Sequence, residues 1–462
     1  MIRKELCRAQ RGTSFMQQKT RIQLSDHFTY SKLFRFTFPS IVMMVFTSIC
    51  GVVDGFFVSN FAGSTAFAAI NLVMPFVMIL GGMGFMIGTG GTALVSRKLG
   101  EGEAETANRY FSMCIGLTAL LGAVLSLIGV LFMEPIATLL GATPEMLPDC
   151  VLYGRIITGF TVTFMLQNVF QSFLIAAEKP NLGLLATVAA GCTNMVLDAA
   201  FVGLLRWGVA GAAIATGLSQ CIGGLIPLMF FTRPNDSSLR LRLTKPEIRP
   251  LLQACGNGSS ELMSNISSSL VSMIYNFQLL RYVGQDGISA YGVLMYVQFI
   301  FVAISIGYSI GSAPVISFHY GALHYDELKS LLKKSVRLTA GAGVVLTALA
   351  YGLAAPLAKI FVGYDAGLLA LTVHAFRLFC FSFLLSSFNI FASSFFTALN
   401  DGAVSAAISF LRTLIFQTSA VLLLPLLLKT DGIWLSNTVA EVCAFAISVI
   451  FLFAKRKKYQ YF

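Results

Sequence analysis

The feature that most limits how this chain can fold is a series of long apolar segments. A transmembrane helix needs about 20 consecutive apolar residues, and twelve segments reach that length. They lie at residues 36–59, 66–93, 108–132, 151–174, 182–204, 208–231, 252–279, 287–312, 335–358, 368–395, 403–427 and 433–454. The apolar runs are continuous and do not alternate with polar residues, which argues against a membrane β-barrel. The sequence therefore predicts an all-α integral membrane protein with twelve transmembrane helices.

The amino-acid composition excludes other classes of protein. Of the 462 residues, 56% are apolar and 11% are charged, whereas about 25% are charged in an average soluble domain. Too few charged side chains are present to cover a soluble enzyme of this length, and a disordered chain is excluded by the high apolar content. The nine cysteines lack metal-binding spacing, and the embedded residues build no Ser-His-Asp arrangement. We therefore expect no enzymatic activity and no cofactor.

The positions of the basic residues predict how the chain is oriented in the membrane. If the N-terminus is cytoplasmic, 25 of the 32 Lys and Arg residues fall in segments on the inner side, as the positive-inside rule requires. An even number of spans then returns the C-terminus to the cytoplasm. We predict a cytoplasmic N-terminal segment at 1–35, a basic cytoplasmic tail at 455–462 and residence in the plasma (inner cell) membrane. The net charge of +11 is therefore explained by basic residues that orient the chain in the membrane and lie beside lipid headgroups. No nucleic-acid partner is expected.

The sequence also repeats itself at a spacing of 221 to 224 residues. The matching positions are Gly63 and Gly284, Gly100 and Gly321, Pro135 and Pro356, Ser172 and Ser394, and Gly208 and Gly432. Such a constant offset predicts two pseudo-symmetric six-helix lobes related by an axis along the membrane normal. The N-lobe is expected at 36–231 and the C-lobe at 251–454, joined by a polar cytoplasmic linker at 232–250.

Two lobes around a central cleft are typical of secondary transporters. The phosphate-binding motif GxxxxGK[ST] of an ATP-driven pump does not occur. The energy for transport is therefore expected to come from an ion gradient. A membrane scaffold that moves no solute is the alternative from another class.

Acidic residues inside predicted spans are candidates for function, because burying a carboxylate in hydrocarbon costs several kcal/mol. Four such residues are present: Asp54, Asp198, Glu261 and Glu441. In the N-lobe, Asn194 and Asp198 share one helix face because they are four residues apart. If that face meets Asp54, the resulting pocket can bind Na⁺, or it can hold a carboxyl group that takes up and releases a proton.

Two neighbouring N-lobe spans each carry a further pair of polar residues on one face. These supporting residues are Thr216 with Gln220 and Asn168 with Gln171. They either join the ion pocket or form ordinary hydrogen bonds between helices. Pro39, near the cytoplasmic end of the first span, weakens the helical hydrogen-bond ladder and permits bending.

In the C-lobe, a polar stripe runs along one face of the seventh span. It comprises Asn257, Glu261 and Asn265, each four residues apart, and it can line the cleft and meet a cationic substrate. Arg412 lies within the eleventh span and needs an acidic partner, for which Glu261 and Glu441 are both candidates. A buried pair of Arg412 with Glu441 would be structural.

Several of these stretches resemble the multidrug and toxic compound extrusion (MATE) family, over nearly the whole chain. The similar stretches are Pro39 with Val53-Asp54, the segment Ala93–Gly100, and Asn194–Asp198 followed by Gly208–Thr216. The family has twelve helices in two lobes and exports cationic organic compounds or drugs in exchange for Na⁺ or H⁺. The resemblance implies an N-lobe cation site at Asp54, Asn194, Asp198 and Thr216, with Asn168 and Gln171 nearby.

The resemblance implies a monomeric antiporter that works by alternating access. A cation entering from outside would bind at Asp54 and Asp198, let the first helix bend near Pro39 and drive the drug out. Some members place acids on both helix 7 and helix 10, but the tenth span here has none, which argues against a C-lobe Na⁺ site.

The alternative function is that of a flippase for a lipid-linked saccharide, or an exporter of another native metabolite, in the related superfamily. A flippase would need a basic cleft for pyrophosphate, and the embedded residues here are mostly acidic. The major-facilitator class is disfavoured because its GxxxDRxG loop motif is absent.

Overall fold

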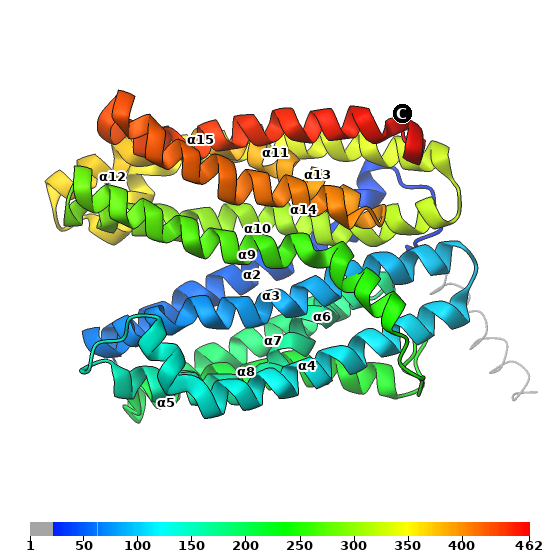
Figure 1. Cartoon of the computed structure of the whole chain (residues 1–462), viewed down its shortest axis with the longest axis horizontal. Helices are drawn as coiled ribbons and strands as arrows, with labels where there is room; N and C mark the ends of the chain where they lie inside the picture. The colour runs from blue at the N-terminus through cyan, green and yellow to red at the C-terminus, as the bar shows by residue number, and fades with distance from the viewer. Residues whose placement is uncertain (1–21, 62) are drawn as a thin grey trace, which may run out of the picture.

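The apolar segments fold as helices because only a helix satisfies all of its own backbone hydrogen bonds in hydrocarbon. A computed structural model of the chain describes residues 22–61 and 63–462, and these residues form a bundle of long helices (Figure 1). The N-lobe contains α2 (Tyr30–Phe61), α3 (Ser64–Gly100), α4 (Ala104–Leu139), α5 (Leu147–Gly159), α6 (Thr161–Ala176), α7 (Pro180–Asp198), a π-helical segment η1 (Ala199–Leu204) and α8 (Gly208–Thr232).

The C-lobe repeats this order. It contains α9 (Ile248–Tyr282), α10 (Gln285–Gly321), α11 (Tyr325–Val362), α12 (Ala366–Phe379), a 3₁₀ turn η2 (Cys380–Ser382), α13 (Phe383–Ala398), α14 (Gly402–Phe410), a π-helical segment η3 (Leu411–Phe416) and α15 (Gln417–Tyr459). The predicted all-α membrane fold in two lobes is confirmed.

By length and composition alone, nine of the described helices can cross a membrane, or ten if α5 and α6, which meet at a 55° bend, form one broken span. Two further crossings explain the difference from the predicted twelve. The continuous helix Gly402–Tyr459 has a non-helical residue, Lys429, at φ 50°, and the chain reverses direction in this stretch (Figure 1). Helix α9 is 35 residues long, but its seven serines and three asparagines make it less apolar than the nine helices named above.

Residues with positive φ reveal the internal repeat in the backbone itself. They recur at the same positions of both lobes: Gly63 and Gly284, Gly102 and Leu323, Glu178 and Asn400, and Arg206 and Lys429. Each pair is 221 to 223 residues apart. Because L-residues rarely adopt this conformation, the shared offsets show that equivalent turns have the same geometry in the two lobes.

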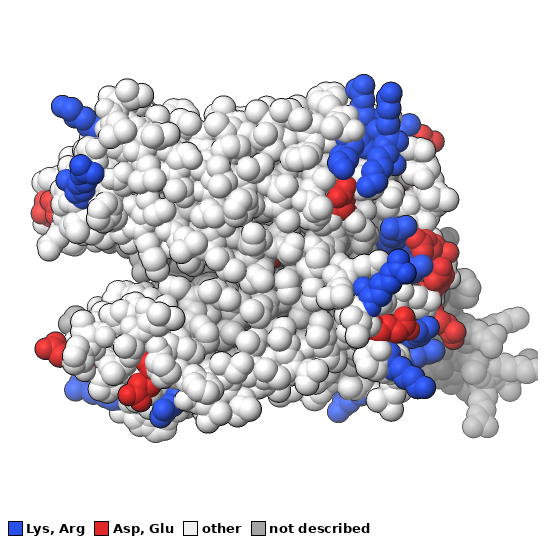
Figure 2. All heavy atoms as spheres, in the orientation of Figure 1, with Lys and Arg blue, Asp and Glu red and all other residues white. Residues whose placement is uncertain are grey.

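The two lobes touch at one end and separate at the other. In Figure 1, α2–α8 form the lower half and α9–α15 the upper half, and the C-terminus lies at the right-hand end. Figure 2 shows a cleft between the halves at the opposite, left-hand end, while Lys and Arg side chains gather at the right. We call the right-hand end, where the lobes meet, the closed end.

Glycines allow the two lobes to approach at backbone distance at the closed end. A Cβ added to Gly90 of α3 would lie 2.0 Å from the carbonyl oxygen of Ala254 on α9. The repeat-related Gly100 and Gly321 meet in the same way, since a Cβ on Gly100 would lie 2.1 Å from the Phe318 oxygen. Only glycine fits where two helix backbones come this close.

The ends of the lobes differ from the predicted boundaries. Helix α2 begins at Tyr30, inside the segment predicted as 1–35, of which residues 1–21 lie outside the described part of the chain. The region 455–462, predicted as a basic cytoplasmic tail, begins within α15, which continues to Tyr459. The side chains of Tyr459 and Tyr461 are buried against the C-lobe. These two tyrosines fix the segment to the C-lobe. They are not considered in the prediction, which rests on the basic residues alone.

Candidate functional site

Two carboxyl groups meet inside the N-lobe. Asp54 lies on α2 and Asp198 is the last residue of α7, and these two helices pack together. Gly191 makes this approach possible, since a Cβ there would lie 2.5 Å from the sulfur of Cys50 on α2. Asp198 is fully buried, and its side chain is within hydrogen-bonding reach of Asp54. The structure thus brings together two acids that are 144 residues apart in the sequence.

Three of the four oxygens of these carboxyl groups are buried without a hydrogen-bond donor among the described residues. Both side-chain oxygens of Asp198 and Oδ1 of Asp54 are buried, and no donor among the described residues reaches them. Buried polar atoms in proteins are almost always paired. Two facing carboxylates repel each other, and this repulsion is relieved when a cation binds between them or when one of them takes up a proton. The site therefore has the chemistry to take up a cation.

Three other side chains lie beside the two aspartates. Asn194, one turn before Asp198, donates through Nδ2 to Oγ1 of Thr216 on α8 at 3.5 Å. Tyr153 of α5 is almost fully buried and interacts electrostatically with both carboxyl groups. Sequence reasoning missed Tyr153, because a single tyrosine in an apolar run gives no sign that its hydroxyl faces a polar pocket.

The backbone changes form next to Asp198. The α-helix ends at this residue and continues as the π-helical segment η1. π-Helical turns are rare and occur mostly at functional sites. A π-helical turn is wider than an α-helical turn. The residues after Asp198 therefore face other directions than they would in a continuous α-helix.

The other predicted N-lobe residues are also buried between helices. Asn168 donates to the backbone oxygen of Gly81 on α3 at 3.2 Å. Gln171 and Gln220 are buried, and their Oε1 atoms receive no hydrogen bond from the described residues. Within the described part of the chain, no hydrogen bond connects these three residues to Asp54 or Asp198. A role of these three residues in supporting the cation pocket stays a prediction.

Pro39 lies near the closed end, far from the acids. Helix α2 runs through Pro39 and Asp54 without interruption, and bending at Pro39 on cation binding stays a prediction. Helix α2 also forms the contact with the C-lobe, because Gly307 and Gly311 of α10 pack against its residues Ser40 and Thr37. One helix therefore joins the candidate cation site to the contact between the lobes.

The C-lobe contains a carboxylate whose bonding is complete. Glu441 of α15 accepts hydrogen bonds from Arg412 of η3, at 2.7 Å from Nη2 and 2.9 Å from Nε. Asn389 of α13 donates to the other carboxylate oxygen at 2.7 Å. Glu441 is 2% exposed. This group already has all the donors it needs, in contrast to Asp54 and Asp198.

The predicted polar stripe on α9 does not act as one surface. Asn257 is buried and donates to the backbone oxygen of Thr397 on α13 at 2.8 Å, so it packs inside the C-lobe and does not line the cleft. Asn265 donates to the Glu261 carbonyl of its own helix at 2.8 Å and packs beside Gly82 of α3. Glu261 lies close enough to Arg412 for electrostatic attraction. The helix that faces this side of α9 changes from α13 beside Asn257 to α3 beside Asn265, so the three residues have different surroundings.

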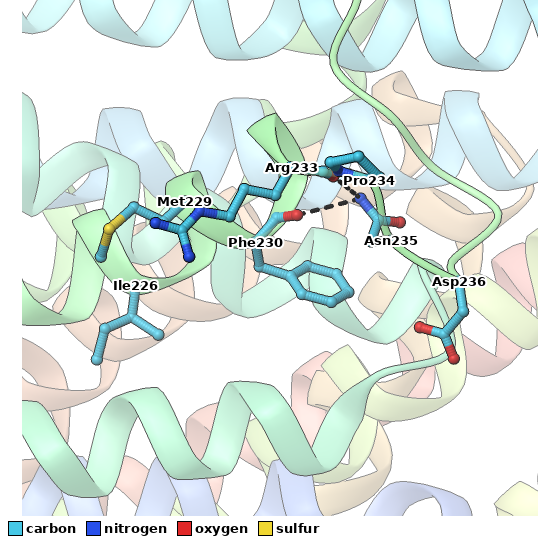
Figure 3. Close-up of a pocket in the computed structure, with 7 residues that line it drawn as sticks. All are labelled: Ile226, Met229, Phe230, Arg233, Pro234, Asn235 and Asp236. Atoms are coloured by element: carbon cyan, nitrogen blue, oxygen red, sulfur yellow. Dashed lines mark hydrogen bonds between the residues drawn. The ribbon is translucent and has the colours of Figure 1, made fainter.

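A pocket of about 680 Å³ lies at the end of α8 and is separate from the acids (Figure 3). It is lined by Ile226, Met229, Phe230, Arg233, Pro234, Asn235 and Asp236. Figure 3 shows the Arg233 guanidinium turned back along α8 toward Met229. The pocket contains none of the predicted site residues. It therefore does not compete with the N-lobe acids as a candidate cation site.

Comparisons with known proteins agree with this architecture. A profile of the MatE family matches residues 39–200 and 262–420. The multidrug export protein MepA of Staphylococcus aureus (strain NCTC 8325 / PS 47) is 23% identical over 426 residues, which cover 91% of this chain and 93% of that protein. MepA of Staphylococcus haemolyticus is 26% identical over 293 residues, which cover 63% of this chain and only 64% of that protein.

A solved structure has the same fold. It is described as the outward-facing conformation of a multidrug resistance MATE family transporter of the MOP superfamily, with a TM-score of 0.88 and 20% identity. The match covers 94% of this chain and 97% of that one. The profile alone matches more than half of the chain, in both lobes. The chain therefore belongs to the MatE family of multidrug and toxic compound extrusion transporters.

Proposed function

We propose that this protein is a cation-coupled antiporter that exports cationic organic compounds in exchange for H⁺ or Na⁺. The observation that carries the proposal is the pair of half-buried Asp54 and fully buried Asp198. The two carboxyl groups lie within reach of each other, and three of their four oxygens are buried and receive no hydrogen bond from the described residues. A proton shared between the two groups, or one Na⁺, would neutralise the excess charge.

The contrast with the C-lobe supports placing the coupling ion in the N-lobe. Glu441 is equally buried, but Arg412 and Asn389 satisfy it. A carboxylate with a permanent cationic partner has little need of a transported cation. Asp54 and Asp198 have no such partner among the described residues. For Na⁺, the amide oxygen of Asn194 and the hydroxyl of Thr216 would add neutral oxygen ligands.

Helix α2 offers a path from cation binding to movement of the lobes. It carries Asp54 in its second half and contacts α10 in its first half. Pro39 lies within that contact and leaves the carbonyl of Arg35 without its helical donor, so α2 is weakest there. Cation binding would remove the charge at Asp54, allow α2 to bend at Pro39 and thereby change how the lobes meet. Coupling follows if the cation and the drug favour different states.

The proposed orientation places the cleft on the outer side of the membrane. Lys and Arg side chains gather at the closed end, where the C-terminus lies (Figure 2), and the positive-inside rule assigns that end to the cytoplasm. The conformation is then open to the outside. The relatives named as multidrug export proteins support organic drugs as the substrate class.

The test is ethidium efflux from energised cells that express the protein at matched levels. Asp54→Asn and Asp198→Asn should each abolish efflux, because an amide cannot release a proton and binds Na⁺ weakly. Asp286→Asn, an equivalent change at an exposed position of α10, should leave efflux unchanged. Removing Na⁺, or collapsing the proton gradient with an ionophore, identifies the coupling ion. Normal efflux by both site variants would overturn the proposed cation site, and no efflux by the wild type would overturn ethidium-like cations as substrates.

A further inference from the structure

The eight described residues before α2 make most of their contacts with the lobe to which α2 does not belong. This segment, residues 22–29, lies against the C-lobe, and we call it the N-terminal strap. Leu24 and Phe28 are 2% and 0% exposed and join an apolar cluster with Ile316 of α10 and Leu328 of α11. Burial of two such side chains fixes the strap to the C-lobe.

Polar contacts reinforce this attachment. Glu327, in the first turn of α11, accepts a hydrogen bond from the backbone N–H of Phe28 at 2.9 Å. Its second oxygen contacts Nδ1 of His27 at 2.5 Å. Lys334, two turns further along α11, donates to the backbone oxygen of Phe28. The strap is thus held on the C-lobe by both apolar and charge-assisted contacts.

The other end of the strap reaches the N-lobe. The backbone N–H of Leu24 donates to Oε1 of Glu178 at 2.8 Å. Glu178 lies between α6 and α7 and has φ 58°. Its repeat-related residue in the C-lobe, Asn400, has the same backbone conformation and also reaches the opposite lobe, since its Nδ2 lies 3.5 Å from the oxygen of Ala93. The same turn of each lobe therefore makes a contact across the closed end.

We propose that the N-terminal strap is a latch that fastens the two lobes at the closed end and stabilises the conformation seen here. Opening of this end requires the lobes to part between Glu178 and Glu327. The strap must then release one of them. The C-lobe attachment has two buried side chains and several polar contacts, whereas between residues 22–29 and Glu178 the structure describes one charge-assisted hydrogen bond. The strap therefore stays on the C-lobe and releases Glu178. This inference rests on the alternating access of the proposed function, but it concerns a segment that contains no part of the cation site.

The test measures the distance between the lobes directly, in the full-length protein in lipid nanodiscs. Spin labels are placed through non-canonical amino acids at Glu105 and Lys329, two exposed positions at the closed ends of the N-lobe and C-lobe. Glu178→Ala should raise the ratio of separated to closed lobes about tenfold, as expected for loss of a hydrogen bond to a charged group. Phe28→Ala loosens the C-lobe attachment without touching either carboxylate and should shift the ratio the same way.

Matched controls separate the latch from a general charge effect. Glu103→Ala and Asp326→Ala remove carboxylates at the same end of each lobe, and neither residue contacts the strap. Both should leave the distance distribution unchanged. Glu178→Gln keeps an acceptor oxygen and should restore part of the wild-type distribution. An unchanged distribution in both Glu178→Ala and Phe28→Ala would overturn the latch, as would an equal shift in the controls. Because this readout needs no transported substrate, it can succeed even if the proposed drug efflux fails.

Discussion

Replacement of Gly258 by alanine should force the closed end apart. Gly258 lies on α9, where it crosses α3, and an added Cβ would lie 1.9 Å from the carbonyl oxygen of Met86. Contacts of a Cβ below 3.0 Å are essentially absent from proteins, so the two helices must move apart by at least about 1.1 Å. The obstacle is backbone on both sides, and no change of rotamer can relieve it.

The size of the effect follows from known costs of overpacking. An added methyl group in a tight contact costs about 1–3 kcal/mol, and this cost is relieved when the lobes part. A shift of one to two kcal/mol changes a population about fivefold to thirtyfold. The gain in helix propensity, about 1 kcal/mol, is the same in both conformations. Gly258→Ala should therefore favour the conformation with the closed end open.

Gly256→Ala is the matched control. It lies two residues away on the same helix, and an added Cβ there meets no atom within 4 Å. The assay is the distance distribution between spin labels at Glu105 and Lys329. We expect a population with longer distances for Gly258→Ala and the wild-type distribution for Gly256→Ala. If the two variants give the same distribution, the close crossing of α3 and α9 does not hold the lobes together, and the reasoning is refuted.

Three further predictions concern other parts of the molecule. Glu441→Gln removes the carboxylate that Arg412 hydrogen-bonds, while Glu261 stays nearby, and should lower the free energy of unfolding by about 1.5–3 kcal/mol, measured by denaturation; a loss below about 1 kcal/mol would contradict the structural role of the pair. Thr216→Val removes a candidate Na⁺ ligand but no ionisable group, so it should weaken Na⁺-driven efflux severalfold and leave H⁺-driven efflux unchanged; unchanged Na⁺ dependence would remove Thr216 from the site. Burial opposes ionisation of Glu101, directly after α3, but hydrogen bonds from Lys98 and Arg97 outweigh it and hold the pKa of Glu101 below its ordinary value of 4.5. A lowered pKa in the folded state contributes stability above pH 4.5 that is lost as the pH falls through the folded-state value, so melting curves of Glu101→Gln should lose less stability on acidification than the wild type, and parallel curves would contradict this contribution.

The fold could be predicted from the sequence because both of its signals can be read directly from the order of residues. The apolar runs mark the helices, and the repeat marks the two lobes. The pairing of α2 with α7 was also accessible, since only a few carboxylates occur in the spans and Asn194 and Asp198 share a face. The hydropathy pattern could not show that Tyr153 lies beside the two acids. An apolar run that contains one tyrosine looks the same whether that side chain faces lipid, another helix or a polar pocket.

The spacing of residues in the sequence could not predict which helices pack against α9, nor where the N-terminal strap binds. The surroundings of Asn257, Glu261 and Asn265 could not be predicted, because i, i+4 spacing places residues on one face but does not say which helix packs against each part of that face. Along α9 that neighbour changes from α13 at Asn257 to α3 at Asn265. The strap was hidden for a different reason. Its two buried residues, Leu24 and Phe28, are surrounded by polar and charged residues, and they are buried only because a distant lobe covers them.

The unusual composition of α9 imposes an order on the biogenesis of the protein. Helices enter the bilayer from the translocon one after another, and their insertion depends on how apolar they are. A helix with seven serines and three asparagines is a poor candidate for insertion by itself. By the time α9 is synthesised, the glycine-containing face of α3 is already in the membrane and can receive it. We therefore expect the first lobe to act as an intramolecular chaperone for the first helix of the second.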